Sequence, residues 1–402
     1  MKKPELLAPA GNMEKLKVAV HYGADAVYLG GESFGLRNFA GNFSVDEMAH
    51  AVSYCHDRGV KAYLTVNAYL ANSDLPEIER YLERILPIPL DAYIVSDPAV
   101  LSLIREKIPS AVCHLSTQAN TTNWRSALFW QTQGVSRINL ARETTLEAIK
   151  ETRNHISAEL EIFVHGALCI SYSGRCLLSN IMSKRDANKG ECTHPCRWGY
   201  ALVEESRPGE YYPVIENGKG TFIFNSRDLC LIDHIPELVQ SGVDSLKIEG
   251  RMKGINYVAS VVRVYRNAID RFCDDPETYA PDPCWKEELA KLSHRGYTTG
   301  FLLGPPKEEG QEYDSSYIRT HDFVGIVKEV DTDGNALIDV RGQINKNDRL
   351  EFAGKDFTLL SCTASGMLSP EGQPQEVANP NHVIKLKPPF PVYPFDLVRK
   401  LK

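Results

Sequence analysis

Short apolar segments recur along the first two thirds of the chain, and most of them follow a stretch with helical periodicity that ends at a turn residue. The eight strand-like segments are ELLAPAG (5–11), ADAVYLGG (24–31), KAYLTVNAYL (61–70), DAYIVSD (91–97), AVCHLSTQAN (111–120), VSRINLARE (135–143), LEIFVHGALC (160–169) and VDSLKIEG (243–250). Apolar runs of about four to eight residues that alternate with helices are typical of a parallel sheet. Eight of them within about 250 residues predict a closed (β/α)8 barrel of the TIM type.

The competing α/β architecture is an open, doubly wound sheet. That fold usually carries a glycine-rich phosphate loop after its first strand, and LAPAGNMEK (7–15) lacks the G-x-G-x-x-G spacing. In a barrel, chemistry is carried by the loops at the carboxyl ends of the strands. The polar residues predicted at those ends are Glu32, Asn67, Asp97, Gln118, Arg142, Glu143, His165, Lys247, Glu249 and Arg251.

The pattern predicts three regions. Residues 1–270 form the barrel, which a cysteine-bearing loop and a small antiparallel hairpin interrupt at about 168–224. Residues 271–320 form a Pro- and Asp-rich linker with short helices. Residues 321–402 contain six short alternating strands separated by polar turns, which predicts a small C-terminal β-barrel. Such modules bind nucleic acid or substrate, or act only as a structural cap.

Composition narrows the class of protein. Of the 402 residues, 43% are hydrophobic and 24% are charged, as in a soluble globular protein. The net charge of −7 argues against a general nucleic-acid coat, because phosphate binding relies on concentrated Lys and Arg. The N-terminal sequence MKKPELLAPAGN lacks the apolar run of a signal peptide, and no segment approaches the roughly 20 apolar residues of a membrane span. We therefore expect a cytoplasmic protein without membrane contact.

Four cysteines, Cys169, Cys176, Cys192 and Cys196, are spaced C-x6-C-x15-C-x3-C. In a reducing compartment, cysteines this close more often bind metal or perform redox chemistry than form disulfides. Structural zinc sites usually present two short cysteine pairs, and only the second pair here has that spacing. The longer first loop suits a larger iron–sulfur cluster. Zinc remains the alternative, as does a role for all four as small buried apolar side chains.

The other six cysteines are scattered singly and are expected in the core. Cys230 is a partial exception, because FNSRDLC (224–230) ends a strand-like segment that could bring this thiol near the four.

The run EIFVHGALCISYSGRCLLS (161–179) resembles the peptidase U32 family, which is named for collagenase-like proteases. The residues that fit the family pattern are Glu161, Phe163, Gly166, Cys169, Gly174, Cys176 and Ser179. ELLAPAGN, GADAVYLG, SRDLC and LKIEGRMK are similar to it too, so the resemblance covers roughly residues 4–270. The C-terminal module resembles the one found in bacterial tRNA-hydroxylating members.

The resemblance implies an oxygen-independent hydroxylase that converts the wobble uridine of tRNA to 5-hydroxyuridine, with prephenate as the oxygen source. It assigns a 4Fe-4S cluster to Cys169, Cys176, Cys192 and Cys196, and leaves room for an electron donor as a further partner. One alternative is a U32-type peptidase, although H-E-x-x-H does not occur in the chain. Another is a zinc-stabilised RNA-binding scaffold.

Substrate-binding residues follow from the chemistry of prephenate, a dicarboxylate. Guanidinium groups bind carboxylates in bidentate fashion, which selects Arg142, Arg175, Arg227 and Arg251. The alternative for each arginine is an ion pair between barrel loops.

Asn67 and Gln118 are predicted to read a base edge, unless they only complete buried hydrogen bonds. His165 and Glu249 are the predicted acid–base residues. Their alternatives are a histidine packed near the cluster and a Glu249–Arg251 ion pair.

Overall fold

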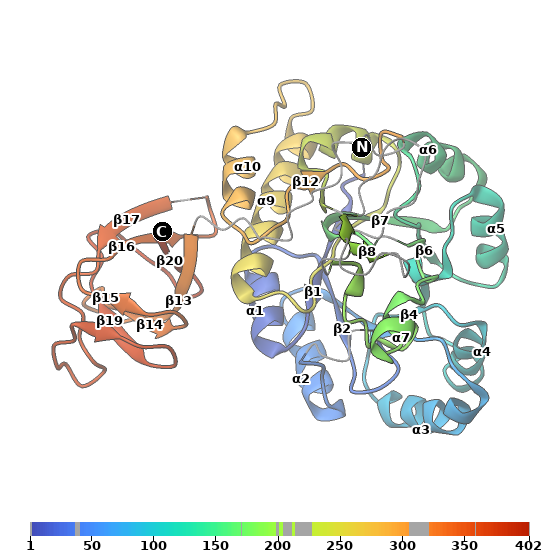
Figure 1. Ribbon diagram of the computed structural model, residues 1–402, viewed down its shortest axis with the longest axis horizontal. Helices are drawn as coiled ribbons and strands as arrows, with labels where there is room; N and C mark the ends of the chain where they lie inside the picture. The colour runs from blue at the N-terminus through green and yellow to red at the C-terminus, as the bar shows by residue number, and fades with distance from the viewer. Residues whose placement is uncertain are drawn as a thin grey trace.

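The computed structural model describes residues 2–36, 41–169, 171–197, 201–203, 211–213, 227–304, 321–357 and 359–401. Figure 1 shows a large α/β domain and a smaller all-β domain beside it. The barrel strands are β1 (Glu5–Ala10), β2 (Ala26–Gly30), β3 (Lys61–Val66), β4 (Ala92–Val95), β5 (Cys113–Leu115), β6 (Arg137–Asn139), β7 (Glu159–Ala167) and β11 (Ser245–Ile248). Each lies within one of the eight strand-like segments of the sequence, except that β7 begins one residue before its segment.

The eight strands pair in parallel in chain order, and β11 closes the barrel by pairing with both β7 and β1. The predicted TIM-type barrel is therefore confirmed. The helices around it are α1 (Met13–His21), α2 (Val45–His56), α3 (Leu75–Ile85), α4 (Pro98–Lys107), α5 (Trp124–Thr132), α6 (Leu146–His155), α8 (Ile235–Gln240) and α9 (Ile255–Asp274). The predicted domain boundary at residue 270 lies within α9.

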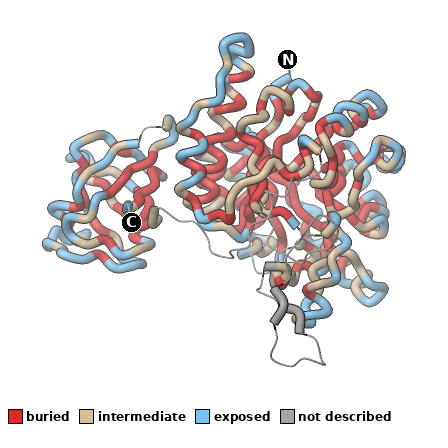
Figure 2. Tube along the Cα trace, turned by 45° about the horizontal axis from the view of Figure 1, so that its top comes forward, coloured by how far each residue is buried: buried red, intermediate tan, exposed pale blue. Residues whose placement is uncertain are grey.

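Local sequence signals set where the barrel helices begin. The Asn12 side chain accepts a hydrogen bond from the Lys15 N–H at the start of α1, and Ser44 forms a reciprocal capping box with Glu47 at the start of α2. Such caps satisfy backbone N–H groups that have no partner inside the helix. The apolar faces of the helices pack on the outer face of the barrel, where Figure 2 shows the buried residues concentrated.

The segment between β7 and β11 interrupts the alternation of strands and helices in the barrel. It contains α7 (Leu178–Ser183), the antiparallel pair β8 (Ala201–Val203) and β9 (Tyr211–Pro213), and β10 (Asp228–Cys230). The predicted hairpin thus appears as β8–β9, while the segment GTFIFNS (220–226) lies outside the described residues. β10 pairs antiparallel with the last residues of β7 and parallel with β12 (Tyr297–Thr298), which follows α10 (Pro283–Ala290).

The C-terminal domain is an antiparallel β-structure with its own core. Its strands are β13 (His321–Val330), β14 (Ala336–Val340), β15 (Ile344–Asn345), β16 (Arg349–Ala353), β17 (Leu359–Thr363), β18 (Val377–Ala378), β19 (Val383–Leu386) and β20 (Leu397–Leu401). The six predicted strands form one sheet in the order β17-β16-β20-β13-β14-β19, and β15 and β18 pair separately. Within the described residues, no backbone pairing joins the two edge strands of the six-stranded sheet.

A buried ion network fixes the two domains together. Arg399 of β20 lies against Glu288 of α10 at 2.5 Å, and Arg263 of α9 contacts the same carboxylate at 2.5 Å. All three side chains are at most 2% exposed. Burial alone would raise the pKa of Glu288, but Arg399 and Arg263 hold it well below its usual range. The carboxylate therefore stays charged and links the domains.

No helix in the described part of the chain is both long and apolar enough to span a membrane.

Candidate functional site

A pocket with a cavity volume of about 130 Å³ lies at the carboxyl ends of the barrel strands. It is lined by Cys169, Cys176, Cys192 and Cys196 together with barrel residues from β2, β3, β6, β7 and β11 and the loops that follow them. Four thiols that are up to 27 positions apart in the sequence thus converge on the place where barrel proteins do chemistry.

Glu143, after β6, anchors the loop that carries the first cysteine pair. Its carboxylate accepts hydrogen bonds from the Ser173 N–H at 3.0 Å and from the Ser173 hydroxyl at 3.2 Å. Gly174 follows with φ +76°, and a Cβ there would lie 2.0 Å from the Gln118 carbonyl oxygen. Only glycine allows this close approach, which seats the loop against the residues after β5.

Hydroxyl groups tie the second cysteine pair to α7. The Thr193 hydroxyl, next to Cys192, lies 2.7 Å from the Ser183 hydroxyl and 3.1 Å from that of Ser179, which is fully buried. The Thr193 N–H also donates to Ser179 Oγ at 3.1 Å. These contacts hold the segment with Cys192 against the helix that follows Cys176.

The donor set fits a thiolate-bound group in chemistry and in place. All ten cysteines of the chain are thiols, and the four in the pocket are the only ones that line it. In the described residues, however, no three His, Cys, Asp or Glu side chains are gathered closely enough to hold a metal ion. Binding of a cluster or of zinc would therefore require these thiols to turn toward a common centre.

Three cationic side chains line the same pocket as the cysteines, and we call them the cationic wall. Arg251 is 3% exposed and donates to the Thr65 hydroxyl at 2.8 Å, and a Cβ on Gly30 would meet its guanidinium at 2.0 Å. Arg142 stacks on the ring of Phe163 at 4.0 Å. Lys247, 3% exposed, reaches the same wall from β11. Together they favour an anionic ligand.

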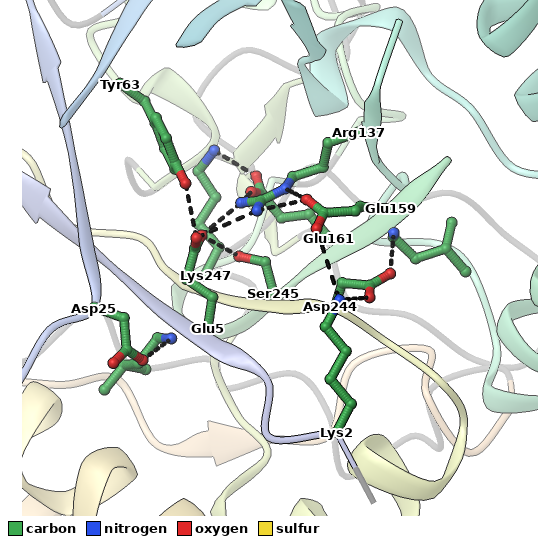
Figure 3. Close-up of polar contacts among 12 residues, drawn as sticks. Lys2, Glu5, Asp25, Tyr63, Arg137, Glu159, Glu161, Asp244, Ser245 and Lys247 are labelled. Atoms are coloured by element: carbon green, nitrogen blue, oxygen red, sulfur yellow. Dashed lines mark hydrogen bonds and ion pairs between the residues drawn. The ribbon is translucent and has the colours of Figure 1, made fainter. Parts of the chain in front are cut away.

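Lys247 belongs to a network of charged side chains inside the barrel. Its ammonium donates to Glu161 at 2.7 Å, and Glu161 also contacts Arg137, which pairs with Glu5 at 2.5 Å. Figure 3 shows these side chains pointing toward one another across the barrel interior. Burial lowers the pKa of Lys247, although Glu161 opposes the shift.

Among the other predicted site residues, Asn67, Gln118 and Glu249 also line the pocket. Asn67 is engaged structurally: its amide donates to Ser116 and its oxygen accepts from the Leu36 N–H. The backbone of Glu249 accepts a hydrogen bond from the Tyr257 hydroxyl at 2.7 Å. Arg142 and Arg251 belong to the same lining, so five of the eight predicted residues that are not cysteines meet here.

Three predicted residues lie outside the pocket lining. His165 is 1% exposed on the far side of β7, among the rings of Tyr257, Tyr265 and Tyr297, and burial lowers its pKa to about 3. Arg175 is exposed on the cysteine loop, and Arg227 precedes β10. The geometry thus gives His165 a packed environment rather than access to the pocket.

Cys230 does not line the pocket either. It lies in β10, on the same side of β7 as Tyr265.

Two pocket residues received no role from the sequence. Lys247 was predicted to lie at the end of a barrel strand but was given no function. The presence of a lysine within the otherwise apolar strand SLKI could have indicated one. Asn139 ends β6 at 1% exposure, and its side-chain oxygen has no hydrogen-bond partner among the described residues. Nothing in the sequence around Asn139 indicated a function, because a single asparagine at the end of a short strand is common.

Fold and pocket together define a TIM-barrel protein with a cysteine-lined site where barrel enzymes hold their active centres. The sequence profile of peptidase family U32 matches residues 11–312, and that of the peptidase family U32 C-terminal domain matches residues 319–399. The chain belongs to peptidase family U32.

Relatives within the family carry different names. The chain is 41% identical to tRNA hydroxylation protein P1 of Bacillus subtilis, over 100% of this chain and 96% of that protein. It is 39% identical to tRNA hydroxylation protein P of Escherichia coli, over 94% of this chain and 92% of that protein. A protein of Porphyromonas gingivalis named collagenase is 33% identical, over 80% of this chain and 79% of that protein.

Proposed function

We propose that this protein is a tRNA-modifying hydroxylase that acts without molecular oxygen and forms 5-hydroxyuridine at the wobble position. The observation that carries the proposal is the convergence of four thiols and three cationic side chains on one barrel pocket. The similarity over the whole chain to proteins named for tRNA hydroxylation supports the reaction class.

Cys169, Cys176, Cys192 and Cys196 would hold a 4Fe-4S cluster, with zinc as the alternative. When bound, such a cluster supplies electron transfer or a Lewis-acidic iron next to the substrate. The protein's part is to place the thiols, through the Glu143–Ser173 hydrogen bonds on one side and the Thr193 hydroxyl contacts on the other. An electron donor is a further expected partner.

Prephenate is the proposed oxygen source, and its two carboxylates match the cationic wall. Arg142 and Arg251 would each bind a carboxylate, while Lys247 contributes positive charge from the pocket floor. Because Thr65 and Phe163 already orient the two guanidinium groups, the wall is formed before the ligand arrives.

The uridine must leave the anticodon stack to reach a pocket inside the barrel mouth. The side-chain oxygen of Asn139 is an acceptor that suits the N3–H of uracil, and the ring of Tyr28 offers an aromatic surface in the same lining. Glu249 is the pocket carboxylate that can accept or return a proton during hydroxylation.

The first test is iron and acid-labile sulfide content, together with the visible spectrum, of protein purified without oxygen. We expect about four irons per chain, with loss in Cys176→Ala and retention in Cys362→Ala, a matched variant in the C-terminal domain. Nucleoside analysis of tRNA from a deletion strain should then show loss of 5-hydroxyuridine. Zinc, or no metal, in the anaerobic protein would overturn the cluster and favour the scaffold alternative.

A peptidase is the second candidate function, because one relative is named collagenase. A peptidase needs an activated nucleophile with its base. His165, the histidine nearest to Cys169 in the sequence, faces Tyr265 outside the pocket, whereas His194 lines the pocket together with the cysteines. Hydrolysis of gelatin by the anaerobic protein, abolished in Cys169→Ala, would support this candidate over the hydroxylase.

A further inference from the structure

A second cavity, of about 390 Å³, lies between the barrel and the C-terminal domain. Its barrel side is formed by Lys15 of α1 and by Lys253 with the first turn of α9, and its other side includes His321, Phe323 and Arg341 of the C-terminal domain. We call this cavity the interdomain cleft. Figure 1 shows the C-terminal domain beside α1 and α9, where these elements meet.

We propose that the interdomain cleft binds the phosphodiester backbone of the RNA whose base enters the cysteine-lined pocket. This inference rests on the proposed action on tRNA and adds a second contact region to it. The lining contains four Lys or Arg side chains, Lys15, Lys253, Lys291 and Arg341, and a single acidic one, Glu14. Arg341 pairs with Glu14 at 2.6 Å, and Lys291 pairs with Glu351 at 2.7 Å. The net positive charge of the lining therefore comes from Lys15 and Lys253; in a chain with a net charge of −7 it is local and fits a polyanion.

One short segment forms a wall of both cavities. Glu249 and Arg251 line the cysteine-lined pocket, while Lys253 and Tyr257 line the interdomain cleft. Two hydrogen bonds cross between them: Lys15 donates to the Arg251 carbonyl at 3.1 Å, and the Tyr257 hydroxyl donates to the Glu249 carbonyl. The segment therefore places the two cavities next to each other at the carboxyl end of β11.

Direct contacts between the barrel and the C-terminal domain hold the two sides of the interdomain cleft in place. The Tyr22 hydroxyl of α1's C-terminal end donates to the Phe395 carbonyl at 2.9 Å, and Arg341 pairs with Glu14 across the cleft at 2.6 Å. With the Arg399–Glu288 pair, these contacts hold the C-terminal domain at a constant distance from the barrel. The C-terminal domain thereby forms one side of the proposed RNA-binding site.

The test is the affinity of the full-length protein for bulk tRNA as a function of salt, without any oxygen donor. Lys253→Ala should weaken binding by about tenfold and reduce the slope of log affinity against log salt by about 0.7–0.9, as expected for one lost phosphate contact. Lys253→Arg should restore both quantities. Lys150→Ala removes an exposed lysine on α6, away from the cleft, and should change neither.

Lysine labelling of the wild-type protein gives a readout that needs no variant. Bound tRNA should protect Lys253 and leave Lys150 reactive. If wild-type protein binds tRNA, but Lys253→Ala keeps the same affinity and salt slope and Lys253 is not protected, the interdomain cleft is not the site and the proposed function stands. If wild-type protein does not bind tRNA at all, both proposals fail.

Discussion

At the scale of single residues, Lys247 shows how one side chain can serve both the fold and the site. It is a cation inside the barrel that neutralises Glu161 at 2.7 Å, and it also lines the cysteine-lined pocket. A buried charge that loses its partner is costly, whereas removal of both charges of a pair is often tolerated. The two roles of Lys247 can therefore be separated by changing Glu161 at the same time.

We expect Lys247→Met to lower the free energy of unfolding by about 3–5 kcal/mol, because buried Glu161 loses its 2.7 Å partner and is left with the longer contact to Arg137 at 3.4 Å. The double variant Lys247→Met/Glu161→Gln should recover most of that loss in urea unfolding. Hydroxylation should stay low in both variants if Lys247 also binds the substrate anion. Recovery of activity along with stability in the double variant would reduce Lys247 to a structural role.

At the scale of elements, the cysteine loop depends on how closely two backbones approach. Gly174 combines a positive φ with a carbonyl oxygen 2.0 Å from where a Cβ would be. Gly59, after α2, has a similar φ of +69° but no atom within 4 Å of its Cβ position. Comparing substitutions at the two glycines therefore distinguishes the effect of backbone strain from the effect of losing the contact between the cysteine loop and Gln118.

Gly59→Ala should cost only the strain of a left-handed conformation, about 1–2 kcal/mol of unfolding free energy, and leave the cysteine loop in place. Gly174→Ala should also displace the loop from Gln118, so that the anaerobic protein retains less iron and the Ser173 amide exchanges faster with solvent. Iron analysis and hydrogen exchange measure these effects. Equal iron content in the two variants would contradict the importance of this contact.

At the scale of the whole molecule, the buried ion network makes the two domains one unit. Glu288→Gln removes the carboxylate that Arg399 and Arg263 share, and leaves Arg399 with its longer contact to Glu351 at 3.1 Å. Glu287→Gln changes the exposed neighbour on the same helix. At neutral pH we expect Glu288→Gln to lower the free energy of unfolding by about 3–5 kcal/mol, and Glu287→Gln to leave it almost unchanged.

The pH dependence of this loss follows from the lowered pKa of Glu288. Its usual value is 4.5, and below that pH the unfolded state takes up a proton that the folded state still excludes. The difference in unfolding free energy between wild type and Glu288→Gln should thus be complete above about pH 4.5 and shrink as the pH falls below it. A difference that grows on acidification would contradict the assigned charge state.

The barrel strands could be predicted from sequence because strands buried on both faces appear as continuous apolar runs. The four cysteines could be predicted to share a site because their spacing is dense. The Glu143–Ser173 contact and the Arg399–Glu288 pair could not, since each joins residues that only the folded chain brings together. His165 shows a different limit. Regular alternation would place it on the same face as Glu161 and Phe163, but an extra residue in β7 between Phe163 and His165 shifts the register against β11 and turns His165 to the other side.

The late position of β11 has a consequence for synthesis. β1 to β7 leave the ribosome first, but the strand that joins their two open edges follows only after residues 168–244. At about 5–20 residues per second, that interval lasts on the order of 4–15 seconds. During it, the nascent sheet has unpaired strand edges and the thiols have no closed barrel beside them. The pocket that the thiols line is therefore complete only after β11 has been synthesised.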